Sequence, residues 1–239
     1  MQGFGKLIWI DSKSQPTASQ SKSVYKGSFV ANIFHGQGKI NWGNGDIYEG
    51  SFENGQYHGK GEFRWGSSQK LFYKGDFRRG KMHGDGVFNN PYGVFDGEFK
   101  FGFLEGKAIA TFCNGDRYSG EFHHSQMTGQ GCYYNITDGT QIIGIFENGV
   151  CNKHGKKIYP DGRVYIGEFY NDVENGKGVM ISGDVRIRGI WRNAQLVEEL
   201  VSQPLSYETS TAVAAATATL ENKARGQSGT NQRGLSSKR

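Results

Sequence analysis

One short pattern recurs eight times along the chain at intervals of 22 to 25 residues: an aromatic or aliphatic residue, any residue, glycine, any residue, and an aromatic residue. The glycine is present in every copy and the last position is always aromatic. Alternate residues share one face of a β-strand, so the pattern predicts strands with rings and glycines on a single face. The copies are Tyr25-Gly27-Phe29, Tyr48-Gly50-Phe52, Tyr73-Gly75-Phe77, Phe95-Gly97-Phe99, Tyr118-Gly120-Phe122, Ile142-Gly144-Phe146, Tyr165-Gly167-Phe169 and Ile187-Gly189-Trp191.

A second pattern, Gly-x-Gly, follows most copies, although Ala108 replaces its second glycine once and Lys153 replaces its first glycine once. Pairs such as Asn54-Gly55 join the two halves of a unit, and pairs such as Asn44-Gly45 join successive units. Asn-Gly favours a tight hairpin because both residues accept positive φ. Each unit is therefore predicted to be one β-hairpin in an antiparallel meander. The Gly-x-Gly pairs are Gly36-Gly38, Gly59-Gly61, Gly84-Gly86, Gly129-Gly131 and Gly176-Gly178.

The glycines are expected to make room for rings. A flat ring on one strand needs an empty place on the neighbouring strand, and a residue without a side chain supplies it. Gly50 and either Gly59 or Gly61 are predicted to be such places. With strands about 4.8 Å apart, eight hairpins would form an elongated array on the order of 80 Å long.

The chain starts in the middle of a unit, because Gly3 to Trp9 matches Gly59 to Trp65 in its two glycines and its tryptophan. Residues 1–10 are therefore predicted to be a half repeat. This half repeat is a cap, the remainder of a chain that has lost its beginning, or an edge that a partner strand completes.

The remaining boundaries follow from composition. Residues 11–24 are rich in Ser and Gln and predict a polar loop, and residues 25–192 carry the repeat array. Leu196, Val197, Leu200 and Val201 have helical spacing and predict a short capping helix over 193–203. Residues 204–239 contain little that is apolar and predict a disordered basic tail.

Charge and cysteine usage exclude several classes of protein. Of the net charge of +5, the tail supplies five basic residues minus two acidic ones, +3, so the body lacks the basic face of a nucleic-acid binder. Three cysteines are too few for a disulfide framework. No apolar stretch has the length of a signal-peptide core or a membrane span. We expect a cytoplasmic protein, with association to a membrane or the cytoskeleton left open.

Catalytic, cofactor and metal sites are not predicted. The segment Gly75 to Lys81 matches the first seven places of a G-x-x-x-x-G-K phosphate loop, but Met82 stands where the magnesium-binding Ser or Thr should be. The histidines His35, His58 and His83 occupy equivalent places in three units, which should be about 10 Å apart and too far to share one zinc ion. They are expected to pack or hydrogen-bond locally.

The cysteines Cys113, Cys132 and Cys151 are out of phase with the repeat and are expected to be buried or half-buried thiols. Cys113 could act as a nucleophile with His123 or His124 as its base only if these side chains meet.

One basic cluster is the candidate lipid-binding site. It lies around the third unit, and only Asp76 opposes it nearby. Such a cluster attracts anionic lipid at about 1 kcal/mol per charge, while its alternative is a solvated charged face. Its residues are Lys70, Lys74, Arg78, Arg79 and Lys81.

The unit Tyr-x-Gly-x-Phe-x-x-Gly-x-x-His-Gly-x-Gly, seen nearly whole at Tyr48 to Gly61 and Tyr73 to Gly86, resembles the MORN repeat (membrane occupation and recognition nexus). The resemblance extends from about Gly3 to Trp191 and implies a curved, elongated meander of hairpins. MORN arrays occur in junctional membrane proteins, in plant phosphatidylinositol phosphate kinases, beside a lysine methyltransferase domain, in ciliary radial spokes and in protist cytoskeletons.

Three functions are consistent with this resemblance. The first is a non-enzymatic scaffold, with a cytoskeletal or ciliary setting left open, whose aromatic and glycine face binds a protein partner and whose open end strands assemble homo-oligomers. The second is a peripheral module that binds anionic phospholipid through the basic cluster. The third is the regulatory fragment of a larger kinase-like or methyltransferase protein.

Overall fold

The computed structural model describes residues 2–10, 22–66 and 70–200 of the chain. These residues form strands and turns but no helix, and so no helix among them could cross a membrane. The chain divides into two compact units, Met1–Cys151 and Asn152–Arg239. The predicted all-β class is confirmed.

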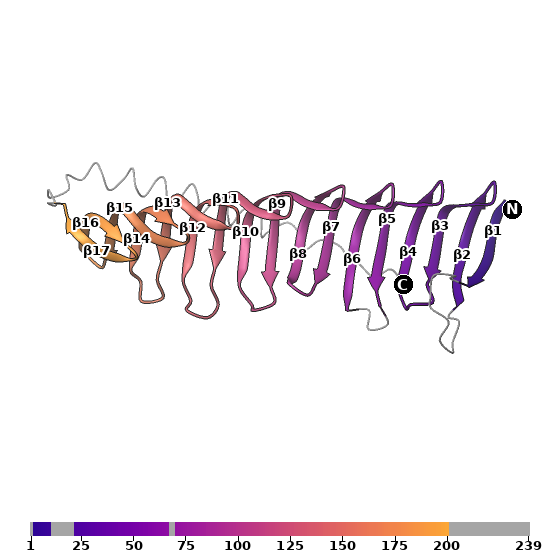
Figure 1. The fold of residues 1–239 in the computed structure, drawn as a ribbon, viewed down its shortest axis with the longest axis horizontal. Coiled ribbons are helices and arrows are strands. Elements are labelled where there is room, and N and C mark those ends of the chain that lie inside the picture. The colour runs from indigo at the N-terminus through magenta and orange to yellow at the C-terminus, as the bar shows by residue number, and fades with distance from the viewer. Residues whose placement is uncertain (1, 11–21, 67–69, 201–239) are drawn as a thin grey trace, which may run out of the picture. The chain divides into compact units, whose positions relative to one another are not determined.

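The first unit is an antiparallel meander in which each strand pairs with the next one in the sequence (Figure 1). The predicted half repeat is its first strand. The strands are β1 (Gly3–Ile10), β2 (Lys22–Val30), β3 (Ile33–Asn41), β4 (Ile47–Glu53), β5 (Gln56–Trp65), β6 (Leu71–Arg78), β7 (Lys81–Asn90), β8 (Gly93–Lys100), β9 (Phe103–Phe112), β10 (Arg117–His123), β11 (Gln126–Tyr134) and β12 (Gln141–Glu147).

The second unit repeats this arrangement. Strand β13 begins in the last two residues of the first unit, and from it each strand pairs antiparallel with its successor. The strands are β13 (Val150–Ile158), β14 (Val164–Tyr170), β15 (Val173–Ser182), β16 (Val185–Arg192) and β17 (Gln195–Glu199).

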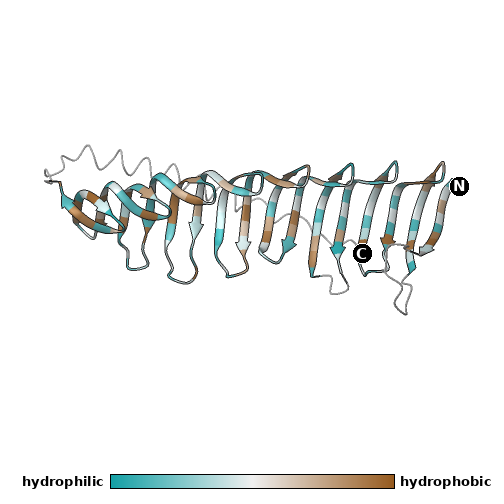
Figure 2. Cartoon of the chain, in the orientation of Figure 1, coloured by the Kyte–Doolittle hydropathy of each residue, from teal (hydrophilic) through white to brown (hydrophobic). Residues whose placement is uncertain are grey.

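The strand register brings the glycines of neighbouring strands opposite one another. Gly50 of β4 pairs with Gly38 of β3 and with Gly61 of β5. Hydrophobic and hydrophilic residues alternate along the strands, as the coloured bands of Figure 2 show, so one face of each unit carries the rings. We call this the ring face. Its continuous glycine row in the first unit is Gly5, Gly27, Gly38, Gly50, Gly61, Gly75, Gly86 and Gly97.

Tyr48 shows why these glycines are needed. Its ring is fully buried, and a methyl group on Gly61 would lie 2.5 Å from the Tyr48 hydroxyl oxygen. A methyl group on Gly50 would lie 2.8 Å from the same atom. The Tyr48 hydroxyl donates a hydrogen bond of 2.8 Å to the carbonyl oxygen of Ser51. The prediction that rings lie over Gly50 and Gly61 is confirmed.

The rings also connect successive hairpins. Tyr48 packs edge to face against Phe52 of its own strand, with centroids 5.0 Å apart, and against Phe77 of the next hairpin at 5.2 Å. The same pair of contacts recurs around Tyr25, Tyr73 and Tyr118, and around Tyr165 in the second unit. The core is thus a row of aromatic rings, in which each hairpin packs on its neighbour.

Gly59 has a different role from Gly61. Its φ is +61°, and a methyl group there would meet nothing closer than 3.6 Å. Three residues of β5, from His58 to Lys60, face the single Ser51 of β4, so Gly59 lies in a β-bulge. Lys153, which replaces this glycine in another unit, keeps the positive value with a φ of 68°. The alternative that Gly59 houses a ring is wrong.

Two kinds of turn close the strands at opposite ends. At one end, Asn54 and Gly55 both have positive φ, as expected for a tight hairpin. The Gly55 amide donates a 2.9 Å hydrogen bond to the Phe34 carbonyl of the preceding hairpin. At the other end, only Gly45 of Asn44-Gly45 has positive φ, and a longer turn forms in which the Trp42 amide bonds the Asp46 carbonyl. We call the two ends the tight-turn edge and the long-turn edge.

The expected capping helix over 193–203 is wrong for its described part. Asn193 and Ala194 form a tight turn with φ values of 50° and 63°, and β17 follows. A methyl group on Gly189 would lie 2.2 Å from Cδ1 of Leu196. The Leu196 side chain therefore covers a strand glycine, as the tyrosines do. Residues 201–203, most of the polar loop and the predicted tail lie outside the described residues.

Candidate interaction surfaces

Five half-buried aromatic residues form a continuous strip on the ring face of the first unit. The pattern's own Tyr and Phe rings are too buried to contact a partner, with exposed fractions of 0–5% from Tyr25 to Phe77, but these five keep exposed surface. Neighbouring centroids are 4.5–6.3 Å apart. We call them the aromatic strip: Trp42, Tyr57, Phe63, Trp65 and Phe88.

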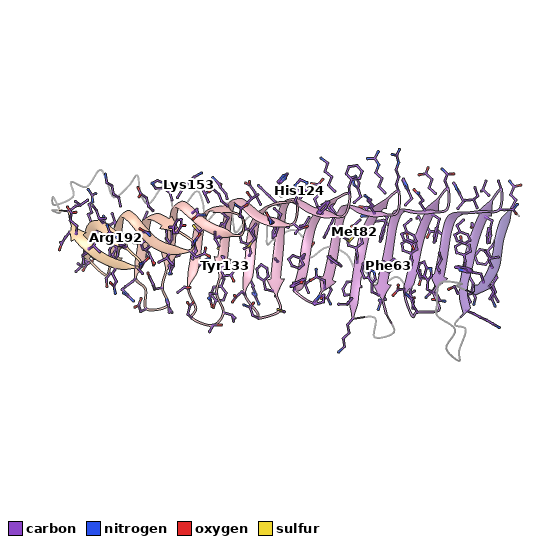
Figure 3. The ribbon with its side chains drawn as sticks, in the orientation of Figure 1. Phe63, Met82, His124, Tyr133, Lys153 and Arg192 are labelled. Atoms are coloured by element: carbon purple, nitrogen blue, oxygen red, sulfur yellow. The ribbon has the colours of Figure 1, made fainter. Side chains whose placement is uncertain are left out.

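Four of the five rings lie toward the long-turn edge, where Figure 3 shows Phe63 toward the other end of the strands from His124, whereas Tyr57 follows the tight turn before β5. Trp42 stacks on Phe63 at 5.5 Å with an interplanar angle of 30°. Burial raises the pKa of Tyr57, with a smaller contribution from the Asp46 carboxylate, so its hydroxyl stays neutral at physiological pH. The strip is therefore an uncharged surface of large rings, which is the composition typical of binding hot spots.

The five basic residues of the candidate lipid site do not form one cluster. Lys70 precedes β6 at the long-turn edge, and Arg78 ends β6 at the other edge, eight positions or about 26 Å away. Lys74 lies between them and its ammonium group is 3.9 Å from the Glu62 carboxylate. The five residues are close in sequence, which suggested a cluster. They are far apart in space because an extended strand separates them.

Three of the five do meet at the tight-turn edge. Arg78, Arg79 and Lys81 flank the turn between β6 and β7, and all three are exposed. The next turn along the same edge presents Phe101 and Phe103, whose exposed fractions are 49% and 48%. We call Arg78, Arg79 and Lys81 the basic turn.

The phosphate-loop match and the equivalent histidines have structural explanations. The place that a side chain on Gly75 would occupy is 2.6 Å from the Tyr73 hydroxyl oxygen, so a ring fills the space that a phosphate would need. The His58 Nδ1 atom lies 2.9 Å from the Glu53 carboxylate, and the His83 ring packs against Phe101 at 5.3 Å. These local contacts agree with the sequence prediction.

The cysteines do not assemble a reactive site with the histidines. Cys113 lies in the turn before β10 and His123 ends that strand, about 20 Å away at the rise of a strand. Cys151 is buried, and Cys132 is half-buried and accepts a 2.8 Å hydrogen bond from Gln141. Burial raises the pKa of Cys132, which disfavours its thiolate. Cys113 is exposed, so the expectation that it is covered is wrong.

The second unit contains a buried polar cluster that was not predicted from the sequence. Glu174 is fully buried at a position where other hairpins carry Phe34, Leu104 or Leu196. Its carboxylate accepts hydrogen bonds from Tyr159 and from Lys157, whose ammonium group lies 3.2 Å from Oε1. Burial is the main cause that raises the pKa of Tyr159. The repeat register could have revealed this cluster, because a carboxylate stands in an apolar column.

The long-turn edge carries a second buried carboxylate. Asp116 accepts hydrogen bonds from the Tyr133 hydroxyl at 2.6 Å and from the Ile136 amide at 2.9 Å. The Tyr133 bond is the largest cause that holds the pKa of Asp116 below its usual value, followed among the lowering contributions by the Ile136 amide and Asn114. Asp116 thus ties two successive long turns together.

Taken together, the folded units define a protein built from tandem β-hairpins. The MORN repeat model matches residues 25–47, 48–70, 73–90, 95–117, 118–136, 143–162 and 165–184, more than half of the chain. The chain therefore belongs to the MORN repeat family. The eighth copy at Ile187 to Trp191 lies outside the matched ranges, although β16 and β17 repeat the hairpin.

The comparison with curated proteins finds no match. Among solved structures, the chain is similar to the wild-type TCP10 domain of Danio rerio CPAP in complex with a peptide of Danio rerio STIL. The two share 13% identity over 83% of this chain and 100% of that chain, with a TM-score of 0.27.

Proposed function

We propose that the chain is a non-enzymatic scaffold that binds a protein partner through the aromatic strip. The observation that carries this proposal is the half-exposed state of five large rings that the repeat pattern does not require. Trp and Tyr supply large contact area at low cost in conformational entropy, and they dominate the energetics of many interfaces. The partner segment is one that presents apolar side chains to an uncharged surface.

Proximity labelling in the native cell tests this proposal with the full chain. Trp42→Ala with Trp65→Ala removes the most contact area while leaving the pattern rings in place. Val94→Ala with Ile109→Ala is the matched control, because both residues are exposed and apolar but lie on the opposite face. Partners that the strip variant loses and the control retains support the proposal. An identical set of partners in wild type and strip variant would refute it.

A cytoskeletal or ciliary setting for this scaffold, and assembly of copies through the end strands, stay predictions. β1 pairs with β2 on one side, and a second copy could pair with its other side. The same labelling data report the compartment, and sedimentation of the full chain reports the oligomeric state. A monomer at all concentrations up to about 100 μM would remove the assembly prediction, since edge pairing is concentration-dependent.

A second function, binding to anionic phospholipid, is favoured by the juxtaposition of the basic turn with Phe101 and Phe103 on one edge. Each basic residue near an anionic surface contributes about 1 kcal/mol, so three supply about 3 kcal/mol at low salt. Two exposed phenylalanines add apolar contact with the acyl boundary. Lys70 and Lys74 lie outside this site.

Flotation with phosphatidylserine vesicles tests the second function. Neutralising Arg78, Arg79 and Lys81 together to Gln should abolish binding, and raising the salt should weaken binding by wild type. The matched control, Lys6→Gln with Lys26→Gln and Lys39→Gln, removes the same charge from residues that pair across neighbouring strands elsewhere. Equal flotation of both triple variants would exclude the basic turn as the lipid site.

A further inference from the structure

Two neighbouring tight turns bring two imidazoles and one carboxylate together. Glu105 lies near the start of β9, His123 ends β10, and His124 is the first residue of the turn that follows. The His123 Nδ1 atom is 3.1 Å from Glu105 Oε2, and the His124 Nδ1 atom is 2.8 Å from His123 Nε2 and 3.8 Å from Glu105 Oε1. One ligand atom from each residue lies within 4.8 Å of the others.

A metal coordination shell requires one ligand atom from each residue to come somewhat closer together than this. Zinc binds imidazole nitrogen and carboxylate oxygen at about 2.0–2.2 Å in a tetrahedron, which places ligand atoms about 3.3–3.5 Å from one another. The 2.8 Å and 3.1 Å contacts use different nitrogens of His123, so one ion can replace only one of them, and ligand atoms that now lie within 4.8 Å of one another must close by roughly 1 Å through side-chain rotation. Both imidazoles are more than 60% exposed, so water can reach the remaining coordination position.

The backbone holds the three residues in place before any ion binds. The His124 amide donates a 3.0 Å hydrogen bond to Glu105 Oε1, and this bond is the largest cause that lowers the pKa of Glu105. The Ser125 amide bonds the Leu104 carbonyl at 2.9 Å, and the Ser125 hydroxyl accepts a 3.0 Å bond from the Leu104 amide. The turn that carries the imidazoles is thus fastened to the residue next to Glu105.

Other hairpins show that the fold does not need this set. At the place of Glu105, the second unit has Asn152, whose side-chain oxygen accepts a 2.9 Å hydrogen bond from the Asn171 amide just as Glu105 does from His124. An asparagine is therefore sufficient to hold the turn. The first position of the tight turn is Asn54 in one hairpin and Asn148 in another, both with positive φ. Two histidines and a glutamate add ligand capacity beyond what the turn requires.

We propose that Glu105, His123 and His124 form a binding site for a divalent transition metal ion of the zinc class. Imidazole nitrogen with carboxylate oxygen is the donor set that suits zinc and its neighbours. The ion replaces the hydrogen bond between the two imidazoles, and the Glu105 carboxylate binds it directly or orients His123. The site lies at the tight-turn edge, away from the aromatic strip, and stands independently of the proposed function (Figure 3).

Calorimetric titration of the full chain with zinc chloride tests this site. One ion should bind per chain, and His124→Asn should weaken binding by at least about tenfold while keeping the turn. Glu105→Asn should also weaken binding by about tenfold, because it keeps an oxygen that accepts the hydrogen bond from the His124 amide but removes the negative charge. His154→Ala and Cys113→Ser are controls, since both side chains are exposed and lie elsewhere.

The backbone amide spectra of each variant show whether the turn is intact. Retained binding in both controls, together with weakened binding in folded His124→Asn, supports the site. A failure of the wild-type chain to bind at zinc concentrations up to about 100 μM overturns it. Unchanged affinity in His124→Asn also overturns it, because the ion would then be held elsewhere.

Discussion

Replacing Gly61 with alanine tests the principle on which the fold depends. The added methyl group would lie 2.5 Å from the Tyr48 hydroxyl oxygen and 2.8 Å from two ring carbons. Tyr48 cannot retreat, because it is fully buried and stacks on Tyr57 at 4.0 Å. The ring must therefore shift against close-packed neighbours.

The expected cost follows from two effects. Overpacking of a core typically destabilises by about 1–3 kcal/mol. Loss of the hydrogen bond from the Tyr48 hydroxyl to Ser51 adds about 1 kcal/mol. Gly61→Ala should therefore lower the free energy of unfolding by about 2–4 kcal/mol. Gly59→Ala, two residues away, has room for its methyl group and should cost only about 1 kcal/mol for its positive φ.

Denaturant unfolding with circular dichroism measures both costs, and hydrogen exchange localises the loss to β4 and β5. Exchange is needed because repeat arrays can unfold in parts. A Tyr48→Phe background should reduce the cost of Gly61→Ala, since it removes the nearest clashing atom. The chain already holds such a combination at Phe95, Gly97 and Ala108. Equal costs for Gly61→Ala and Gly59→Ala would show that the glycines are not ring sites.

Three further predictions concern buried polar groups and the second unit. Asp116 has a folded-state pKa below its unfolded value, so its stabilisation is present at neutral pH and is lost as the pH falls through the folded pKa. Asp116→Asn should therefore lower the free energy of unfolding at pH 7 and reduce its loss at acid pH, as measured by denaturant titrations. Glu174→Leu alone should cost about 3 kcal/mol, because it leaves Lys157 without its buried partner. Glu174→Leu with Lys157→Met should recover most of that loss in the same unfolding assay, since other hairpins carry Leu104 and Met180 at these places. Trp191→Phe should be tolerated within about 1 kcal/mol, because the buried indole nitrogen has no hydrogen-bond partner among the described residues and the other hairpins use Phe. A larger loss of unfolding free energy would contradict this.

Most of the fold was predictable because the repeat fixes which residues share a face. The period of two around Gly50 and the pair Asn54-Gly55 both predict a hairpin, and local and long-range signals agree. The turn at Asn193 and Ala194 escaped prediction because it has no glycine and the apolar residues after it mimic helical spacing. Its position in the repeat, which is equivalent to that of Asn54-Gly55, was the better guide.

The candidate sites were less predictable for a different reason. A run of basic residues looks compact in the sequence, but Lys70 precedes β6 and Arg78 ends it, so the two lie at opposite edges. Conversely, Glu105 and His123 are far apart in sequence and become neighbours only when β9 pairs with β10. Residue spacing along one strand says little about a surface that adjacent strands build together.

The bonds at the two edges have a practical consequence for labelling the protein. Most tight turns are bonded to the hairpin before them, as Gly55 is to Phe34, so an insertion there would disturb two hairpins. The long turns are bonded to one another as well, because Asp46 accepts a 2.6 Å hydrogen bond from the Gly66 amide of the following long turn. A fluorophore or affinity tag is therefore better attached to an exposed side chain than inserted into either kind of turn.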